Sequence, residues 1–175
     1  MVTTRAGERL NGLDIAELGQ YIDAVKADTA KADRNPDVIA RWVGGTRAEV
    51  TSALGGPPVY IGGDDDPGAM GMLLRALAAC DIEVIVTRAT LMGIEIQDLS
   101  IEVKGFFNVA PYLDIETPEG AGYQLASMEV QMRTKGTPPT PDQIAGLRAA
   151  LHDSPVGDTL RRHVPVAIEL DVSTT

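Results

Sequence analysis

Cysteine is nearly absent from this sequence, which has one such residue in 175. That residue, Cys80, cannot form a disulfide within the chain, so the stapled framework of small secreted proteins is excluded. The first ten residues also lack the apolar segment that begins a secretory signal. We therefore expect a cytoplasmic protein whose thiol is kept reduced by its compartment.

Basic residues, aromatic residues and long apolar runs are scarce as well. The 15 Lys and Arg are outnumbered by 25 Asp and Glu, which gives a formal net charge of −10. Nucleic-acid binding needs clustered cations, so we expect no nucleic-acid partner, and anionic lipid is disfavoured for the same reason. The sequence contains no run of about twenty apolar residues, so we expect no membrane span. Aromatic residues make up 4% of the chain, so the core must be aliphatic.

The most informative stretch is residues 65–80, which passes from acids, Pro and Gly into an apolar run that ends at Cys80. This order is typical of a helix N-terminus. Either Asp65 or Asp66 can cap the helix, and Pro67 suits the first turn. Cys80 would then lie about three turns into the helix.

The run continues past the cysteine without a break. Residues 82–87 are β-branched enough to favour a strand locally, but they extend an established helical pattern. Gly93 supplies a C-terminal stop. We predict one long helix over about residues 67–92, apolar over much of its circumference and therefore buried.

The thiol of Cys80 has two interpretations. It is either a buried small hydrophobe or a shielded nucleophile, and spacing alone favours the first, because free cysteine is among the most buried residue types. Leu77 is expected on the same helical face. The neighbouring acids Asp81 and Glu83 are expected to face solvent or to pair with an arginine.

Metal and cofactor sites are not indicated. Residues 64–66 are three aspartates, but adjacent carboxylates point in different directions, and a helix cap within a solvated turn explains them better. No glycine-rich phosphate loop stands between a strand and a helix. We expect neither a metal nor a cofactor.

The remaining patterns define a fold class. A helix capped by Asp14 or Asn11 is expected to begin near residue 15, and we assign residues 1–36 to an N-terminal helical extension and residues 37–175 to the main domain. Strand patterns cluster instead of alternating with helices, which favours an α+β fold with a long central helix clasped by antiparallel strands. The expected strands cover residues 38–43, 46–51, 59–61, 94–105, 123–133 and 164–170; two further helices follow Thr140, which forms a capping box with Gln143, and Ser154.

Several of these segments, taken in order, resemble the OsmC/Ohr family. The segments are Gly71–Cys80, the long helix's cysteine segment; Gly93–Ile96 with the strand after it; residues 154–160 followed by 164–166; and residues 11–14 and 42–46, which are similar to an extended branch of the family. The resemblance covers nearly the whole chain and implies an intertwined homodimer. In such a dimer two long helices pack centrally, sheets wrap them, and the active sites lie where the subunits meet.

The resemblance also implies a reaction. Family members reduce hydroperoxides, especially organic ones. A thiolate becomes a sulfenic acid, a second cysteine condenses with it, and a thiol reductant restores both. By position Cys80 is the peroxidatic residue, but Ser154 occupies the place of the second cysteine, and Met70 occupies that of a Glu that holds an activating Arg.

The activating cation has several candidates. Cys80 lies too deep in its helix to use the N-terminal dipole, so a cation must stabilise its thiolate. Arg47 is the best candidate by resemblance, although it is equally well explained as a solvated hairpin residue. Arg75, Arg88 or a residue of the other subunit are the alternatives.

Two functions follow. The first is a one-cysteine hydroperoxide reductase in oxidative stress defence, with Cys80 as the nucleophile, an activating Arg47 and an external thiol as reductant. The second is a non-catalytic binding protein that holds an apolar small molecule in a pocket at the dimer interface. Met70, Leu77 and the second-cysteine position, Ser154, are the expected pocket residues.

Overall fold

The computed structural model describes residues 7–173; residues 1–6 of the predicted extension and residues 174–175 of the predicted main domain lie outside them. The elements are β1 (Arg9–Leu10), β2 (Leu13–Asp14), α1 (Ile15–Ala27), η1 (Thr29–Ala32), β3 (Val38–Gly44), β4 (Arg47–Ser52), β5 (Val59–Ile61), α2 (Ala69–Leu91), β6 (Ile96–Phe107), η2 (Ala110–Leu113), β7 (Tyr123–Thr134), α3 (Pro141–Ala150), η3 (Leu151–Asp153) and α4 (Pro155–Arg161). All strand pairs are antiparallel, in the orders β1-β2, β3-β4-β5 and β6-β7. The predicted α+β class is confirmed.

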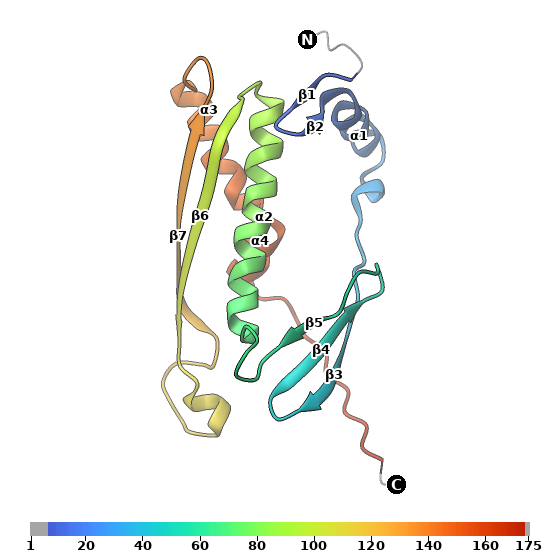
Figure 1. The fold of residues 1–175 in the computed structure, drawn as a ribbon, viewed down its shortest axis with the longest axis vertical. Helices are drawn as coiled ribbons and strands as arrows, with labels where there is room; N and C mark the ends of the chain where they lie inside the picture. The colour runs from blue at the N-terminus through green and yellow to red at the C-terminus, as the bar shows by residue number, and fades with distance from the viewer. Residues whose placement is uncertain (1–6, 174–175) are drawn as a thin grey trace.

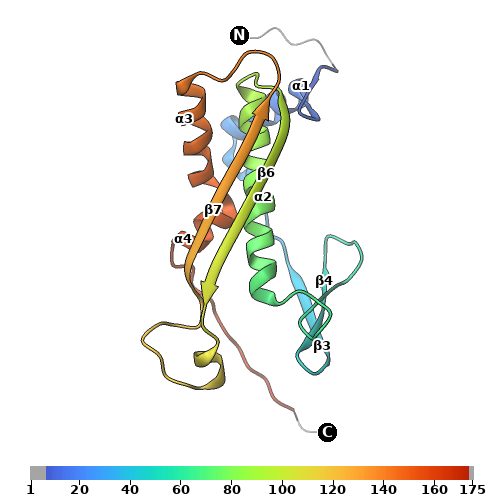
Figure 2. The same cartoon turned by 60° about the vertical axis from the view of Figure 1, so that its left-hand side comes forward.

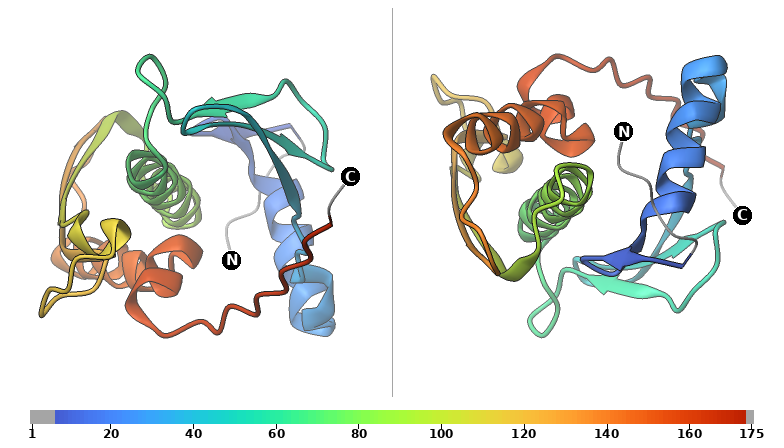
Figure 3. Two further views of the ribbon diagram at one scale, coloured as in Figure 1. Left: turned by 90° about the horizontal axis from the view of Figure 1, so that it is seen from below. Right: turned by 90° about the horizontal axis from the view of Figure 1, so that it is seen from above.

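The long helix α2 runs through the middle of the molecule (Figure 1). The β6–β7 hairpin covers one side of it, together with α3 and α4 (Figure 2). Seen end-on, the N-terminal elements and the β3–β4–β5 sheet lie on the opposite side of α2 (Figure 3). None of the described helices is long and apolar enough to cross a bilayer.

The limits of α2 agree with the sequence, but its cap does not. The helix contains 23 residues, so its β-branched stretch is helical as predicted. The N-cap is Gly68, which makes no side-chain cap bond, and the predicted capping role of Asp65 or Asp66 was wrong. Asp66 instead accepts a hydrogen bond from Arg47 of β4. The carboxylate therefore ties the helix start to the neighbouring sheet.

The core is small and aliphatic. Ile85, Ala89, Ile94 and Leu147 form its buried centre, where α2 meets the β6–β7 hairpin and α3. Partly buried residues of the two strands, such as Val130, pack against this centre. Burial of these side chains supplies the driving force that holds α2 against one side of the molecule.

The N-terminal segment is attached to the end of α2 by one asparagine. Asp14 caps α1 through the N–H groups of Ala16 and Glu17, as predicted. Asn11 takes a left-handed backbone with φ of 52°, and its amide donates to the Thr90 hydroxyl and to the Ile94 carbonyl. The same side chain accepts the N–H of Ile96 at 2.8 Å. These three bonds join two parts of the chain that are about 80 residues apart in sequence.

The last two helices begin as the sequence predicts. Thr140 and Gln143 form the capping box of α3, with Pro141 in its first turn. Ser154 caps α4 through the N–H of Gly157. Both caps supply acceptors for backbone donors that have no partner within a helix.

The predicted C-terminal strand over residues 164–170 was wrong. This segment has no strand structure and runs away from the body of the molecule (Figure 1). Its alternating apolar side chains are almost fully exposed, with 80% for Val166, 85% for Ile168 and 86% for Leu170. A strand requires a neighbour to pair its backbone groups, and no strand within residues 7–173 is hydrogen-bonded to this segment.

Candidate functional site

Cys80 lies on the side of α2, about three turns from the helix start, and is partly buried. Its side chain lines a pocket of about 300 Å³ with Val84, Thr87, Arg88 and Pro155. The thiol is therefore neither sealed in the core nor fully exposed. A sulfur in this position is shielded by apolar neighbours and open on one side to a small molecule.

Ser154 contacts the sulfur from the start of α4. Its hydroxyl donates to the Cys80 sulfur at 3.4 Å and accepts the Gly157 N–H at 3.3 Å. The side chain is fully buried, and the two residues are 74 positions apart in sequence. The hydroxyl thus supplies the sulfur with a hydrogen-bond donor from a distant part of the chain. Of the predicted site residues, these two are in direct contact.

Arg88, two turns after Cys80 on the same helix, is the cation among the described residues that line the Cys80 pocket. Both Arg88 and Asp153 line the Cys80 pocket, and their charged groups are 3.7 Å apart. Glu83 lines it as well. The pocket therefore holds one cation and two carboxylates among the described residues, and the positive charge of Arg88 is already shared with Asp153.

Arg47 lies elsewhere within the chain. Its side chain is bound to Asp66, and its guanidinium carbon is 4.3 Å from the centre of the Tyr60 ring. Both contacts are made at the β4–β5 edge, and Arg47 is not among the residues lining the Cys80 pocket in the described part of the chain. A single subunit does not bring the predicted activating arginine to the sulfur, and its catalytic role stays a prediction.

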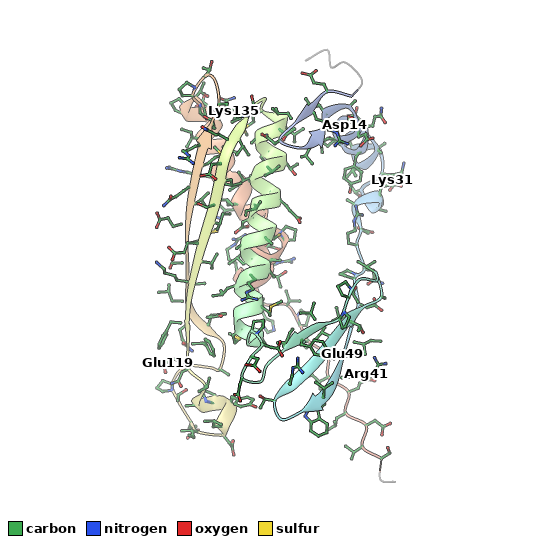
Figure 4. All side chains as sticks on the ribbon, in the orientation of Figure 1. Asp14, Lys31, Arg41, Glu49, Glu119 and Lys135 are labelled. Carbon is green, nitrogen blue, oxygen red and sulfur yellow. The ribbon has the colours of Figure 1, made fainter. Side chains whose placement is uncertain are left out.

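The same sheet contains the tyrosine whose titration is perturbed. The Tyr60 hydroxyl donates to the Glu49 carboxylate at 2.7 Å. That hydrogen bond, followed by the negative charge of Glu49, raises the pKa of Tyr60, and the positive charge of Arg47 opposes the rise. Figure 4 shows the side chains of this sheet, with Glu49 and Arg41 labelled. The cluster Arg47–Asp66–Tyr60–Glu49 is thus a connected polar network on the β3–β4–β5 sheet.

Met70 and Leu77 line a second and larger pocket, of about 620 Å³. It lies between the first half of α2, the first half of β7, and α4. The Met70 carbonyl accepts a hydrogen bond from the Tyr123 hydroxyl at 2.7 Å, which holds the start of β7 against α2. Two of the three predicted pocket residues, Met70 and Leu77, therefore line the same cavity. The third, Ser154, is not among the residues that line this cavity and contacts Cys80 instead.

Asp81 overturns an expectation. We expected it to face solvent or to pair with an arginine, but it is 1% exposed. Neither carboxylate oxygen has a hydrogen-bond partner among residues 7–173. It lines the larger pocket, one helical turn after Leu77. The signal in the sequence was an acid at the i+4 position of a predicted buried leucine, on a helix apolar nearly all round.

No metal centre is built by these residues. The described part of the chain contains no group of three His, Cys, Asp or Glu side chains placed to hold an ion. Asp66, one of the three consecutive aspartates, is engaged by Arg47.

Comparison with solved structures shows the fold. An OsmC-like protein from Mycoplasma pneumoniae superposes with a TM-score of 0.61 at 18% identity, covering 74% of this chain and 89% of that one. An OsmC-like protein of unknown function from Vibrio cholerae gives 0.60 at 10% identity, covering 73% and 94%. An organic hydroperoxide resistance protein from Legionella pneumophila gives 0.52 at 18% identity, covering 73% and 90%.

Comparison with curated proteins found no match. The model of the OsmC-like protein family matches residues 62–169, a span that contains α2 and its cysteine, the β6–β7 hairpin and both C-terminal helices. This match covers more than half of the sequence and includes both the Cys80 site and the larger pocket. The chain therefore belongs to the OsmC-like protein family.

Proposed function

We propose that this protein is a thiol-dependent hydroperoxide reductase of a one-cysteine type, acting on organic hydroperoxides in the cytoplasm as part of oxidative stress defence. The observation that carries the proposal is the contact between Cys80 and Ser154. A half-buried sulfur opens on a small pocket, and the residue at the second-cysteine position touches it at 3.4 Å. That is the arrangement in which a nucleophilic sulfur and its resolving group would meet.

The reaction begins with the thiolate of Cys80. Its sulfur attacks the terminal oxygen of a hydroperoxide, ROOH; the S–O bond forms as the O–O bond breaks, and the alkoxide leaves and takes a proton to become ROH. The sulfur is oxidised to a sulfenic acid and the peroxide is reduced to an alcohol. The Ser154 hydroxyl, which donates to this sulfur in the structure, is positioned to remain its hydrogen-bond donor during the attack.

Turnover then needs an external thiol. Ser154 cannot form a disulfide, so a small thiol condenses with the sulfenic acid, releases water and leaves a mixed disulfide on Cys80. A second thiol attacks that disulfide and regenerates the Cys80 thiol. The reductant is oxidised to its disulfide, and the electrons that reduced the peroxide come from it.

The activating cation is expected from a second subunit in an intertwined homodimer. The exposed surface of the single chain is 13439 Å², whereas a compact monomer of 18.5 kDa exposes roughly 8200 Å². The excess includes apolar side chains on β3, where Trp42 is 77% exposed, and on residues 164–172. A partner chain that covers these surfaces would complete the core and could carry its Arg47, already oriented by Asp66, to the Cys80 pocket.

A protein with the same fold supports the proposal. The Legionella pneumophila protein with this fold is described as an organic hydroperoxide resistance protein. We also propose that the chain divides after residue 36 into an N-terminal extension and an OsmC-like domain.

The test is consumption of cumene hydroperoxide by the full-length protein in the presence of dithiothreitol. We expect turnover by the unmodified protein, none above background by Cys80→Ser, and capture of the sulfenic acid by dimedone when the reductant is omitted. Equal rates for the two proteins, with no dimedone adduct on Cys80, would rule out the reductase.

A second function would then remain. The larger pocket of about 620 Å³, lined by Met70 and Leu77, is the size of a small-molecule site. Binding of an apolar ligand there requires no chemistry at Cys80. The residues that line this larger pocket all belong to one chain, in α2 and α4 and at the start of β7. The binding function was predicted for a pocket at a dimer interface, to which two chains would contribute.

A further inference from the structure

The larger pocket contains an ionisable group that the reductase mechanism does not use. Its apolar wall consists of Met70, Leu73 and Leu77 from α2, Leu125 and Met128 from β7, and Leu160 from α4. Asp81 is part of the same lining, and its carboxylate is buried with both oxygens unpaired in the described structure. We name this cavity the Asp81 pocket.

A buried carboxylate without hydrogen-bond partners lowers the free energy of unfolding. Burial removes the water that would solvate it, and charged groups in cores are ordinarily paired or bonded to several donors. The elements that bury Asp81 belong to one chain, α2, β7 and α4, so the group is already enclosed before any second subunit arrives. The donor that it lacks would therefore have to come from within the pocket.

Two side chains of the pocket lining that carry hydrogen-bond donors are both bonded elsewhere. Arg161 of α4 is the cation in the lining, but its guanidinium donates to the His152 carbonyl and its side chain is exposed. The Tyr123 hydroxyl is committed to the Met70 carbonyl. Neither group satisfies the carboxylate, because no partner of Asp81 is found within residues 7–173.

We propose that the Asp81 pocket binds a small amphipathic amine, with the ammonium group on the Asp81 carboxylate and an apolar body against the leucine and methionine wall. An ammonium supplies both the charge and the hydrogen-bond donors that the carboxylate lacks. The volume of about 620 Å³ lies within the range of small-molecule sites, and an apolar wall with few polar groups is their usual composition.

This site is separate from the Cys80 chemistry. Cys80 and Asp81 are adjacent in sequence, but successive residues of a helix point about 100° apart, and the two side chains line different pockets. The readout below is equilibrium binding, so it neither requires nor tests hydroperoxide turnover.

The experiment is calorimetric titration of the full-length protein with hexylamine, in parallel with hexanol and hexanoate, which have the same chain length. We expect hexylammonium to bind more tightly than either neutral or anionic analogue. In Asp81→Asn, which keeps the side-chain shape, its affinity should fall by about tenfold or more, the effect of losing a charged hydrogen-bond partner. Hexanol binding should be unchanged.

The matched control is Glu129→Gln. Glu129 is exposed on β7 next to Met128 and outside the pocket lining, and its substitution removes the same single negative charge. Hexylammonium affinity in Glu129→Gln should equal that of the unmodified protein. Equal losses in both variants would mean that the amine is attracted by net charge alone, and the proposal would be overturned.

A melting measurement without ligand separates binding from structure. If the carboxyl group is kept for a ligand, Asp81→Asn should melt at or above the unmodified protein, because the replaced side chain makes no hydrogen bond within residues 7–173 that could be lost. A lower melting temperature, together with no binding of hexylamine to the unmodified protein, would assign Asp81 to an internal contact such as one with Arg161. That result would also overturn the proposal.

Discussion

Replacing Ser154 with cysteine should place a second thiol against Cys80. The serine oxygen lies 3.4 Å from the Cys80 sulfur, whereas a disulfide needs a sulfur–sulfur distance of about 2.05 Å. The longer C–S bonds and a shift of about 1 Å at the start of α4 would close this gap. Position 154 begins a helix of seven residues, an element short enough to adjust. We expect a hydroperoxide or diamide to convert both thiols to a disulfide in Ser154→Cys.

The effect on stability can be worked out from the separation in sequence. A cross-link between positions 74 residues apart removes loop entropy from the unfolded chain worth about 4.5 kcal/mol at 25 °C. Loss of the serine cap of α4 subtracts about 1 kcal/mol, because cysteine caps a helix poorly. The oxidised variant should therefore be more stable than its reduced form by about 4.5 kcal/mol, and more stable than the unmodified protein by about 3.5 kcal/mol. For a chain of this size, 3.5 kcal/mol corresponds to a rise of about 10 °C in melting temperature.

The assay is thiol titration in denaturant, a mass measurement, and thermal melting with and without dithiothreitol at one protein concentration. The control is Thr159→Cys, which adds an exposed thiol to the same helix outside the Cys80 pocket and should form no disulfide with Cys80 within the chain on oxidation. Two titratable thiols in oxidised Ser154→Cys, with no change in melting temperature on reduction, would refute the placement of position 154 beside the sulfur.

Three further predictions test other parts of the structure. Asn11→Gly keeps the left-handed backbone but removes three hydrogen bonds to Thr90, Ile94 and Ile96, so urea unfolding should show a loss of about 3 kcal/mol, and a loss below about 0.5 kcal/mol would contradict the linkage. In Glu49→Gln the pKa of Tyr60 should fall toward its ordinary value, because the carboxylate that raises it is gone, and ultraviolet titration should show phenolate at lower pH. In the unmodified protein the raised pKa stabilises the fold below the ordinary pKa of tyrosine, and this stabilisation is lost as pH rises through the folded value. The variant should lack this contribution to the free energy of unfolding. An unchanged titration would show that Glu49 does not control this hydroxyl. Sedimentation should give a particle of twice the 18.5 kDa chain mass, since the single chain exposes far more surface than a compact monomer, and a stable compact monomer would count against the intertwined dimer.

Local signals account for most of what the sequence predicted correctly. The α2 helix was predicted despite its β-branched stretch, because an apolar pattern that continues without a stop outweighs local strand propensity. Thr140 with Gln143, and Ser154 with Pro155, are capping patterns whose donors and acceptors lie within four residues of each other. Residues 38–43 and 46–51 were expected to form strands, and they are β3 and β4, which pair with each other across the short turn that joins them.

The errors share a different physical origin. Asp66 does not cap α2, because the N-cap is Gly68 and the carboxylate of Asp66 is bound by Arg47 of β4. Residues 164–170 have the alternation of a strand but no neighbour to pair with in the single chain. In both cases the local pattern was compatible with the predicted element, and a contact between residues distant in sequence decided the outcome. For Asp66 that contact is the bond to Arg47, and for residues 164–170 it is a strand pairing that the described residues do not make.

For the candidate site, too, some features follow from the sequence and others from contacts between distant residues. The sequence alone determined that Cys80 is the sole thiol and that it lies three turns into a buried helix. The resemblance to the OsmC/Ohr family added that position 154 carries a hydroxyl in the place of the second cysteine. Only the tertiary structure decided that this hydroxyl touches the sulfur. It also decided that, within residues 7–173, Arg47 does not line the pocket of the sulfur and Asp81 is enclosed without a hydrogen-bond partner. Helix spacing and caps depend on neighbours a few residues away, whereas burial and pairing of a charge depend on the packing of α2, β7 and α4, which no local pattern encodes.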